Sequence, residues 1–316
     1  MPSQLKYFVY DVFTTTPFRG NPLAIVHIPP STSLSQNQKQ TIAREFNLSE
    51  TTFVHDDSAS QAQSVFGVDI FTPYQELPFA GHPTIGTGFH LLTNHPNSDI
   101  TLRIKAGDTT VTRSEKAGSV HLQVPVDFKV HPALKLDKIV SHQTRLSPTK
   151  DFKDSQATPI ASIVKGMNFA LVEINSVDAL SRMNTYPENI VVPSAHLGAW
   201  SLSGSQDGTT SVFVYAFTVL DDSNADGLTT RIRARMFGWP GFEDPATGSA
   251  ACTLGGYLGL KKGKGRWRFE VAQGLEIGRQ SEIVVVAEID DGDIVKSVQL
   301  EGSAVRVMEG SLGVEL

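Results

Sequence analysis

Residues 76–88 read ELPFAGHPTIGTG, and residues 243–256 read EDPATGSAACTLGG. Both stretches carry a proline, a glycine three positions after it, and a second glycine seven positions after the first glycine. Both also follow an extended segment and open a run of small residues with helical character. A pattern that occurs twice in one chain indicates an internal repeat. We therefore expect two related halves, with a functional site in the cleft between them.

The repeated Pro-x-x-Gly turn is suited to binding an anion. Glycine allows backbone N–H groups to approach a ligand closely, and the first turn of a helix carries N–H groups with a partial positive charge. The helix starts expected at Gly81 and Gly248 are therefore suited to bind a carboxylate or a developing negative charge. A plain turn at the entry to a helix explains either copy alone, but the matched spacing of the two copies favours a binding role.

The composition is that of an ordinary globular protein. The chain has 316 residues, of which 40% are hydrophobic and 19% charged, and this length suits about two domains. The formal net charge of −6 argues against general binding to nucleic acid or to anionic membranes. The one cysteine, Cys252, excludes a disulfide within the chain and is expected to be a small packed residue. Because the sequence has no signal-peptide pattern and no membrane-spanning apolar run, we expect a cytoplasmic protein.

The order of predicted elements indicates the α+β class, because strands come in runs. Strands are expected at 5–11, 22–27, 50–55, 65–72, 100–105, 109–114, 119–124, 169–174, 212–218, 230–237, 268–272, 283–287 and 304–308. Helices are expected at 84–92, at 249–260, and after Ser35, where Gln38 completes a capping box and Asn47 suits the helix end. The polar range 125–165 is expected to be a domain connection followed by loops.

Motifs for cofactors and metals are not supported. No Gly-x-Gly-x-x-Gly motif lies in a βαβ setting, and residues 81–87 lack the lysine of a phosphate-binding loop. No histidines have the spacing of a His-Glu-x-x-His metal site. Ser249 lies in Gly-Ser-Ala rather than in a Gly-x-Ser-x-Gly elbow. We therefore expect an enzyme without cofactor or metal.

Four motifs, in order along the chain, resemble those of the PhzF-like isomerases of phenazine biosynthesis. They are RGNPLAIV at 19–26, NLSETTFV at 47–54, ELPFAGHPTIG at 76–86 and EDPATGSA at 243–250, and RMF at 235–237 fits as well. The resemblance implies a diaminopimelate-epimerase-like fold, with two pseudo-symmetric domains, each a mixed, mostly antiparallel sheet curved around a central helix. The first domain would span 1–128 and include the C-terminal strand at about 303–316, and the second would span 129–302. A homodimer without a cofactor is also implied.

The resemblance assigns roles to seven residues. The implied catalytic residues are Glu50, His82 and Asp244, and the implied substrate-binding residues are Asn21, Gly81, Gly248 and Ser249. In this assignment Glu50 is the acid and base, while His82 and Asp244 assist the proton transfer and hold the substrate. Taken by itself, Glu50 is also compatible with an ordinary carboxylate at a strand end.

Two positions decide the expected chemistry. The two-cysteine racemases of this fold carry catalytic thiols at the positions of Gly81 and Ser249, and neither residue is cysteine here. A single carboxylic acid must then move the proton, which favours a proton shift over inversion of a stereocentre. Burial would raise the pKa of Glu50 toward neutrality and allow it both to give and to take a proton.

The sequence therefore predicts an isomerase that moves a proton within a small cyclic or conjugated carboxylic acid, similar to dihydro-hydroxyanthranilate isomerase. One alternative is an epimerase or racemase of an amino-acid-like substrate. Another is a non-catalytic protein that binds a small molecule. The expected partner is a small carboxylate, with no nucleic acid and no membrane.

Overall fold

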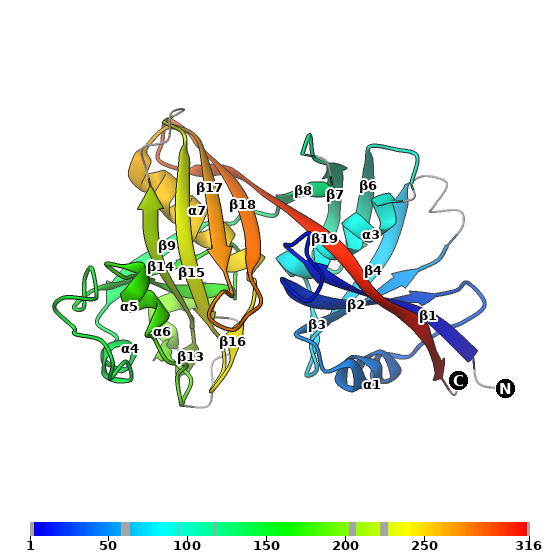
Figure 1. Ribbon diagram of the computed structural model, residues 1–316, viewed down its shortest axis with the longest axis horizontal. Coiled ribbons are helices and arrows are strands. Elements are labelled where there is room, and N and C mark those ends of the chain that lie inside the picture. The colour runs from blue at the N-terminus through cyan, green and yellow to red at the C-terminus, as the bar shows by residue number, and fades with distance from the viewer. Residues whose placement is uncertain are drawn as a thin grey trace. The chain divides into compact units, whose positions relative to one another are not determined.

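The computed structural model describes residues 3–57, 64–93, 95–116, 118–201, 207–221 and 227–314 (Figure 1). Strands dominate the chain and helices are few, as the sequence predicts. The chain divides into two compact units, one of residues 1–124 and 300–316 and the other of residues 125–299. Among the helices of the described ranges, none has the length and apolar character needed to cross a membrane.

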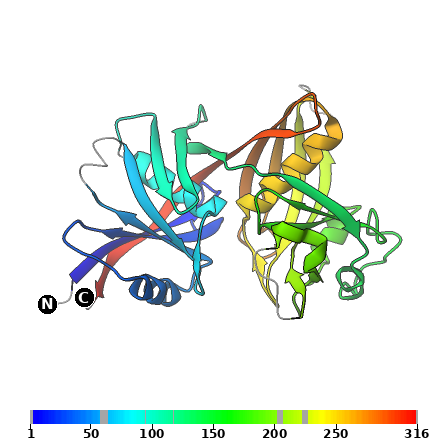
Figure 2. The ribbon, with the colours of Figure 1, turned by 180° about the vertical axis from the view of Figure 1, so that it is seen from behind.

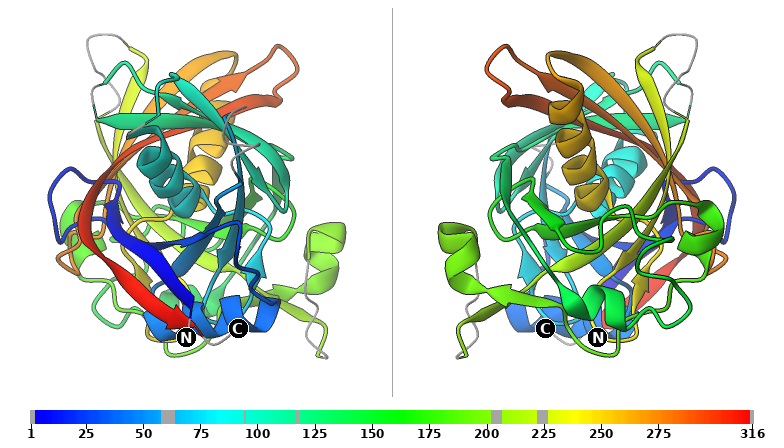
Figure 3. Two further views of the ribbon diagram at one scale, coloured as in Figure 1. Left: turned by 90° about the vertical axis from the view of Figure 1, so that its right-hand side faces the viewer. Right: turned by 90° about the vertical axis from the view of Figure 1, so that its left-hand side faces the viewer.

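Unit 1 is a ring of strands around one helix. Its elements are β1 (Ser3–Val12), β2 (Asn21–Ile28), α1 (Gln36–Phe46), β3 (Glu50–His55), β4 (Val65–Phe71), β5 (Glu76–Leu77), α3 (Gly81–Thr93), β6 (Asp99–Ile104), β7 (Gly107–Arg113), β8 (Ser119–Val124) and most of β19 (Val295–Val314). Strand β1 pairs with β2, β2 with β3, β3 with β4, β4 with β6, β6 with β7 and β7 with β8. Strand β19 pairs with both β8 and β1 and so closes a barrel-like sheet (Figure 3).

Helix α3 fills the ring. It packs against β1, β2, β3, β6, β7 and β8, and most of its residues are buried. A Cβ atom at Gly88 would lie 2.6 Å from Val111 Cγ1 of β7, which is closer than real side chains approach. Glycine at this position is therefore what lets the helix lie directly on the sheet.

Helix α1 covers the outer face of the same sheet. Its Ile42 and Ala43 join Phe53 of β3 and Phe71 of β4 in one hydrophobic core cluster. The predicted helix start is confirmed, since Ser35 and Gln38 form a complete capping box. The predicted end is confirmed as well, because Asn47 has a φ of 50° and directs the chain toward β3.

Unit 2 contains a second mixed sheet. Its elements are β9 (Lys129–Leu134), α4 (Asp137–Ser141), β10 (Thr158–Ser162), β11 (Asn168–Glu173), α5 (Val177–Ser181), β12 (Val191–Pro193), α6 (Ser194–Leu197), a 3₁₀ turn (Gly198–Trp200), β13 (Thr209–Ser211), β14 (Phe213–Asp221), β15 (Thr229–Phe237), β16 (Glu243–Asp244), α7 (Gly248–Lys262), β17 (Gly265–Gln273), β18 (Ser281–Ile289) and the start of β19. The sheet pairs β9 with β10, β10 with β11, β11 with β14, β14 with β15, β15 with β17 and β17 with β18. Helix α7 packs against β10, β11, β17 and β18 (Figure 2).

Helix α7 also depends on a glycine for its packing. A Cβ atom at Gly255 would lie 2.7 Å from Val285 Cγ1 of β18. This glycine matches Gly88 in the sequence repeat, and in both cases the obstructing side chain is a valine on the second strand after the helix. In each repeat motif, a glycine that faces a valine thus allows the helix to pack closely against the sheet of its own unit.

The expectation for residues 125–165 was wrong, because this range contains β9, α4 and β10 rather than loops alone. Strand β9 is mostly exposed and has Pro132 at its centre, so it lacks the apolar alternation of a typical strand. The register with β10 shifts at this point, which accommodates a residue that has no N–H to donate. Strand β19 was also underestimated, since it runs from Val295 to Val314 rather than over 304–308.

A chain of polar side chains runs through unit 1. Nδ1 of His27 lies 2.8 Å from an Asp56 carboxylate oxygen, and Nε2 of His27 lies 2.9 Å from Nε2 of His90. The other ring nitrogen of His90 lies 3.0 Å from the hydroxyl of Tyr10. Burial, aided by the positive charges of neighbouring side chains, lowers the pKa of His90 to about 3. Folded His90 therefore stays neutral at pH values where an unfolded histidine is charged.

This difference predicts that the contribution of His90 to stability falls as the pH drops below about 6.5, the usual pKa of histidine. The unfolded chain then binds a proton at this histidine that the folded protein does not bind. This difference lowers the free energy of unfolding by at most roughly 1.4 kcal/mol per pH unit. Urea unfolding at several pH values between 7.5 and 5 should therefore show His90→Gln gaining stability relative to wild type as the pH falls. The same substitution at His121 of β8 is the control, and a difference between His90→Gln and wild type that does not change with pH would contradict the prediction.

Candidate active site

Glu50 has the properties expected of an acid and base. It is the first residue of β3, paired with Leu23 of β2, and only 17% of its side chain is exposed. Its Oε2 atom lies 3.3 Å from Nδ1 of His82 and forms no hydrogen bond with the described part of the chain. Burial raises the pKa of Glu50 to about 7, although a hydrogen bond with Ser49 opposes the change. This carboxyl group therefore gains and loses a proton near neutral pH.

Two neighbouring residues fix the place of Glu50. The Ser49 hydroxyl donates to Oδ1 of Asn21 at 3.2 Å, and Asn21 begins β2 with only 1% of its surface exposed. Strands β2 and β3 are parallel neighbours, so this contact joins the first residue of β2 to the residue just before β3. Asn21, for which the family resemblance implies substrate binding, thus also holds Ser49 beside Glu50, and this role of Ser49 was not predicted.

The start of α3 places His82 beside the carboxyl of Glu50. This histidine is the second residue of the helix and only 4% exposed. The helical hydrogen bonds begin with the Thr84 N–H, which donates to the Ala80 carbonyl at 3.3 Å. The N–H groups of Gly81 and His82 therefore precede the helical ladder. The partial positive charge of this helix start lies next to the carboxyl of Glu50 and favours anions there.

In unit 2, Asp244 and Ser249 flank a single turn. Asp244 ends β16 and is 8% exposed, while Ser249 is the second residue of α7 and 6% exposed. The carboxylate of Asp244 accepts a hydrogen bond of 2.5 Å from the Thr247 hydroxyl. Because the Ala251 N–H donates to the Thr247 carbonyl at 3.0 Å, the N–H groups of Gly248 and Ser249 precede the helical ladder. The turn therefore combines a fixed carboxylate with the start of a helix.

A buried ion pair fixes β16 on β15. Arg235 donates to both carboxylate oxygens of Glu243, at 2.9 and 2.6 Å, and also to the carbonyl groups of Leu180 and Met183. Glu243 directly precedes Asp244 in β16. The sequence marked 235–237 only as part of a motif and gave no role to this pair. Strand β15 reads TTRIRARMF and carries three arginines, so a charge in this strand did not distinguish Arg235.

Cys252 carries no sign of reactivity. It lies inside α7 with no exposed surface, and burial raises the pKa of its thiol well above the usual range. A thiol in such a site is inert, because the thiolate is the reactive form. The predicted packing role of Cys252 is confirmed. Within the described ranges, no three His, Cys, Asp or Glu side chains are gathered where they could hold a metal ion.

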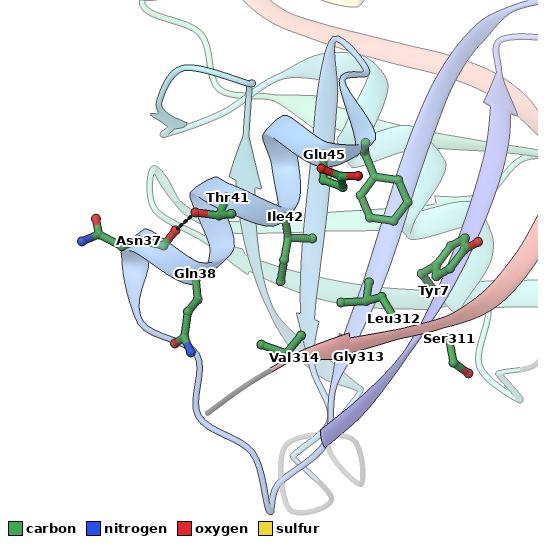
Figure 4. Close-up of a pocket in the computed structure, with 11 residues that line it drawn as sticks. Tyr7, Asn37, Gln38, Thr41, Ile42, Glu45, Ser311, Leu312, Gly313 and Val314 are labelled. Atoms are coloured by element: carbon green, nitrogen blue, oxygen red, sulfur yellow. Dashed lines mark hydrogen bonds between the residues drawn. The ribbon is translucent and has the colours of Figure 1, made fainter. Parts of the chain in front are cut away.

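A groove elsewhere in unit 1 is separate from these residues. It lies between α1 and the last residues of β19, with Tyr7, Ile42, Phe46 and Leu312 among its lining side chains (Figure 4). None of the predicted site residues lines it. The groove therefore contributes no side chain to the candidate site.

The family model of phenazine biosynthesis-like proteins matches residues 10–310 of this chain. The chain belongs to this family. The trans-2,3-dihydro-3-hydroxyanthranilate isomerase of Pseudomonas chlororaphis is 30% identical over 312 residues, which cover 97% of this chain and 98% of the relative. A Pasteurella multocida protein named an uncharacterized isomerase is 33% identical over 300 residues, covering 93% and 90% of the two chains. This phenazine biosynthesis-like protein is accordingly an isomerase of the PhzF type.

Solved structures of other proteins share the fold of this phenazine biosynthesis-like protein. The Bacillus anthracis phenazine biosynthesis protein of the PhzF family has a TM-score of 0.78 at 21% identity, with 99% of this chain and 100% of that chain covered. A hydroxyproline epimerase from Agrobacterium vitis has a TM-score of 0.59 at 13% identity, with 100% and 95% covered. At these identities the likeness concerns the fold alone.

The raised pKa of Glu50 predicts how its replacement changes stability. Between pH 4.5, its usual pKa, and about 7, the folded protein binds a proton at Glu50 that the unfolded chain has lost. The contribution of Glu50 to stability therefore falls as the pH rises through this window, by roughly 3 kcal/mol in total, and Glu50→Gln lacks this change. Urea unfolding at pH 5 and pH 8 should show the variant gaining stability relative to wild type at pH 8.

The matched control for this prediction is Glu115→Gln, which changes an exposed glutamate in unit 1. Its difference from wild type should be the same at both pH values. If the difference between Glu50→Gln and wild type were also the same at pH 5 and pH 8, the carboxyl of Glu50 would have an ordinary pKa and the account of its burial would be wrong.

Proposed function

We propose that this protein is a cofactor-independent isomerase that moves a proton within a small cyclic or conjugated carboxylic acid, with Glu50 as the acid and base. The observation that carries the proposal is the buried carboxyl group with a pKa of about 7, placed 3.3 Å from His82. A group that titrates near the working pH is the most effective proton donor and acceptor. The membership of the family supports the same reaction class.

In the proposed reaction, Glu50 takes a proton from one position of the substrate and returns one to another position on the same face. The net change is an isomerisation, so no electron is gained or lost and no second reactant is needed. His82, with its Nδ1 atom 3.3 Å from Oε2 of Glu50, shares in the proton transfer and helps to hold the substrate. Acid–base catalysis of this kind contributes roughly 10²- to 10⁴-fold, and the rest must come from positioning and from stabilisation of negative charge.

The helix start in unit 2 suits the same kind of ligand. The N–H groups of Gly248 and Ser249, like that of Gly81 in unit 1, suit a carboxylate or the negative charge that develops on a substrate. Asp244 suits a hydrogen-bond donor of the substrate, because its carboxylate already acts as an acceptor from Thr247. The proposed catalytic set is thus Glu50, His82 and Asp244.

We also propose that the two units are pseudo-symmetric copies of one fold. Strand pairing supports this, since β2–β3 and β11–β14 are parallel, β3–β4 and β14–β15 antiparallel, and β4–β6 and β15–β17 parallel. Each unit then has a short strand, β5 or β16, a Pro-x-x-Gly turn and a helix seated on glycine. The expected homodimer and cytoplasmic location remain predictions from the sequence.

The names of the relatives support a substrate class. Those named trans-2,3-dihydro-3-hydroxyanthranilate isomerase cover nearly the whole chain at about 30% identity. We therefore propose a substrate of similar chemistry, with a carboxylate, an amino or hydroxyl group and a partly saturated or conjugated ring. The absence of a thiol at Gly81 and Ser249 favours this proton shift over epimerisation of an amino acid.

The test is deuterium incorporation from heavy water into trans-2,3-dihydro-3-hydroxyanthranilate and a panel of small cyclic and amino carboxylic acids, followed by mass spectrometry. Wild type should label or isomerise at least one compound, and Glu50→Gln should lower that rate by roughly 100-fold or more. The exposed control, Glu115→Gln, should match wild type.

Two other results would count against the proposal. Wild type that binds a compound of the panel but neither labels nor isomerises it would point to a binding protein. Labelling that inverts one stereocentre without moving a double bond would point to an epimerase.

A further inference from the structure

We propose that Trp239 and Phe242 form a stacking surface for the flat, conjugated ring of the substrate, on the same face of the β15–β16 hairpin as Asp244. The inference rests on the proposed function, because it takes Asp244 to lie at the substrate. Trp239 is 40% exposed, and Phe242 is half-buried. Both residues lie between the motifs at 235–237 and 243–250, and no motif included them.

A tight turn brings the two rings together. Residues 239–242 read WPGF, with Pro240 at the second position and Gly241 at the third. This order suits a type II β-turn, because proline supplies a fixed negative φ and glycine supplies the positive φ that the turn requires. Gly241 has a φ of 73°, and the Phe242 N–H donates to the Trp239 carbonyl at 3.0 Å. The first and last side chains of the turn can therefore stand side by side.

The two rings are stacked. Their centroids lie 4.2 Å apart, and their planes differ by 10°. A Cβ atom at Gly238 would lie 3.2 Å from Cδ1 of Phe242, so glycine at this position leaves room for the ring. The Gly241 N–H donates to the carbonyl of the buried Tyr186 at 2.9 Å, which ties the turn to the rest of unit 2. The pair is thus one flat surface on an anchored turn.

The alternation of the hairpin places this surface on the face of Asp244. Strand β16 pairs with β15, and the Gly238 N–H donates to the Phe242 carbonyl at 3.3 Å, which continues the same ladder. Successive residues of a strand point to opposite faces. Glu243 points toward Arg235, whose guanidinium binds its carboxylate. The residues on either side of it, Phe242 and Asp244, therefore share the other face.

An aromatic surface of this kind has a chemical preference. A flat conjugated ring stacks on it over its whole area, whereas a puckered saturated ring meets it with only some of its atoms. The aromatic contact is worth a preference of about two- to tenfold in affinity. The N–H groups of Gly248 and Ser249 follow Asp244 at the start of α7 and suit the carboxylate of such a ligand. The hairpin and the helix start together suit a planar ring that carries a carboxylate.

The alternative is a purely structural role, in which the stacked rings only stabilise the turn. Both roles predict a less stable protein when Trp239 is replaced. Only the stacking role predicts that the folded variant loses its preference for a flat ring over a saturated one.

The experiment compares benzoate with cyclohexanecarboxylate, which carries the same carboxylate on a saturated ring of similar size. Their dissociation constants are measured by ligand-observed NMR. Trp239→Leu keeps an apolar side chain but not a flat one, and should lower the preference for benzoate by about two- to tenfold relative to wild type. Trp239→Phe should keep most of the preference. The matched control is Trp267→Leu, which changes a tryptophan of β17 bonded to the Gly263 carbonyl and should leave the preference unchanged.

Tryptophan fluorescence locates the bound ring. Benzoate should change the emission of wild type and of Trp267→Leu, but not that of Trp239→Leu, because Trp239 is the tryptophan that the ligand contacts. Each affinity is referred to the folded fraction, measured by circular dichroism.

The inference is overturned if Trp239→Leu keeps the wild-type preference and loses only stability, or if wild type binds neither probe. It is also overturned if the change in emission persists in Trp239→Leu. Failure of the proposed function looks different, since benzoate would then bind in a way that depends on Trp239 while no compound of the panel takes up deuterium.

Discussion

The burial of one carboxyl group is the constraint on which the proposed chemistry depends. Taking Glu50 out of water raises its pKa to about 7, and His82 at 3.3 Å is the near polar neighbour of its Oε2 atom. This placement costs stability above pH 7, because the ionised form is poorly solvated. A cost of this kind is common at sites where function, rather than folding, selects the residue.

The fold of unit 1 produces this burial. The capped helix α1 ends at Asn47, and the chain enters β3 directly at Glu50, held by the Ser49–Asn21 contact. Helix α3 fills the ring of strands because Gly88 lets it touch β7. Its first turn then brings His82 and the helix start to the carboxyl. The end of α1 at Asn47 and the close packing of α3 at Gly88 thus together produce the buried environment of the Glu50 carboxyl.

Much of this was accessible from the sequence. The capping box and the strand at 50–55 depend on neighbouring residues, and both are confirmed. Strand β9 was missed because Pro132 and its exposure hide the strand pattern. The hydrogen bond from the Gln273 amide to the Thr247 hydroxyl could not be predicted, because it forms only when β17 lies beside β15 and the β16–α7 turn. The proposed roles of Glu50 and His82 came from the family resemblance. The distance between the two side chains could be obtained only from the structure.

The measurement that tests the account most directly is the ionisation of Glu50 itself. Carbon-13 NMR of glutamate carboxyl groups, followed from pH 4 to 9 in wild type and in Glu50→Gln, assigns the signal that the substitution removes. We predict that this signal titrates with a midpoint near 7. A midpoint near 4.5, the usual value of a glutamate, would contradict the claim that the fold turns Glu50 into an acid and base for neutral pH.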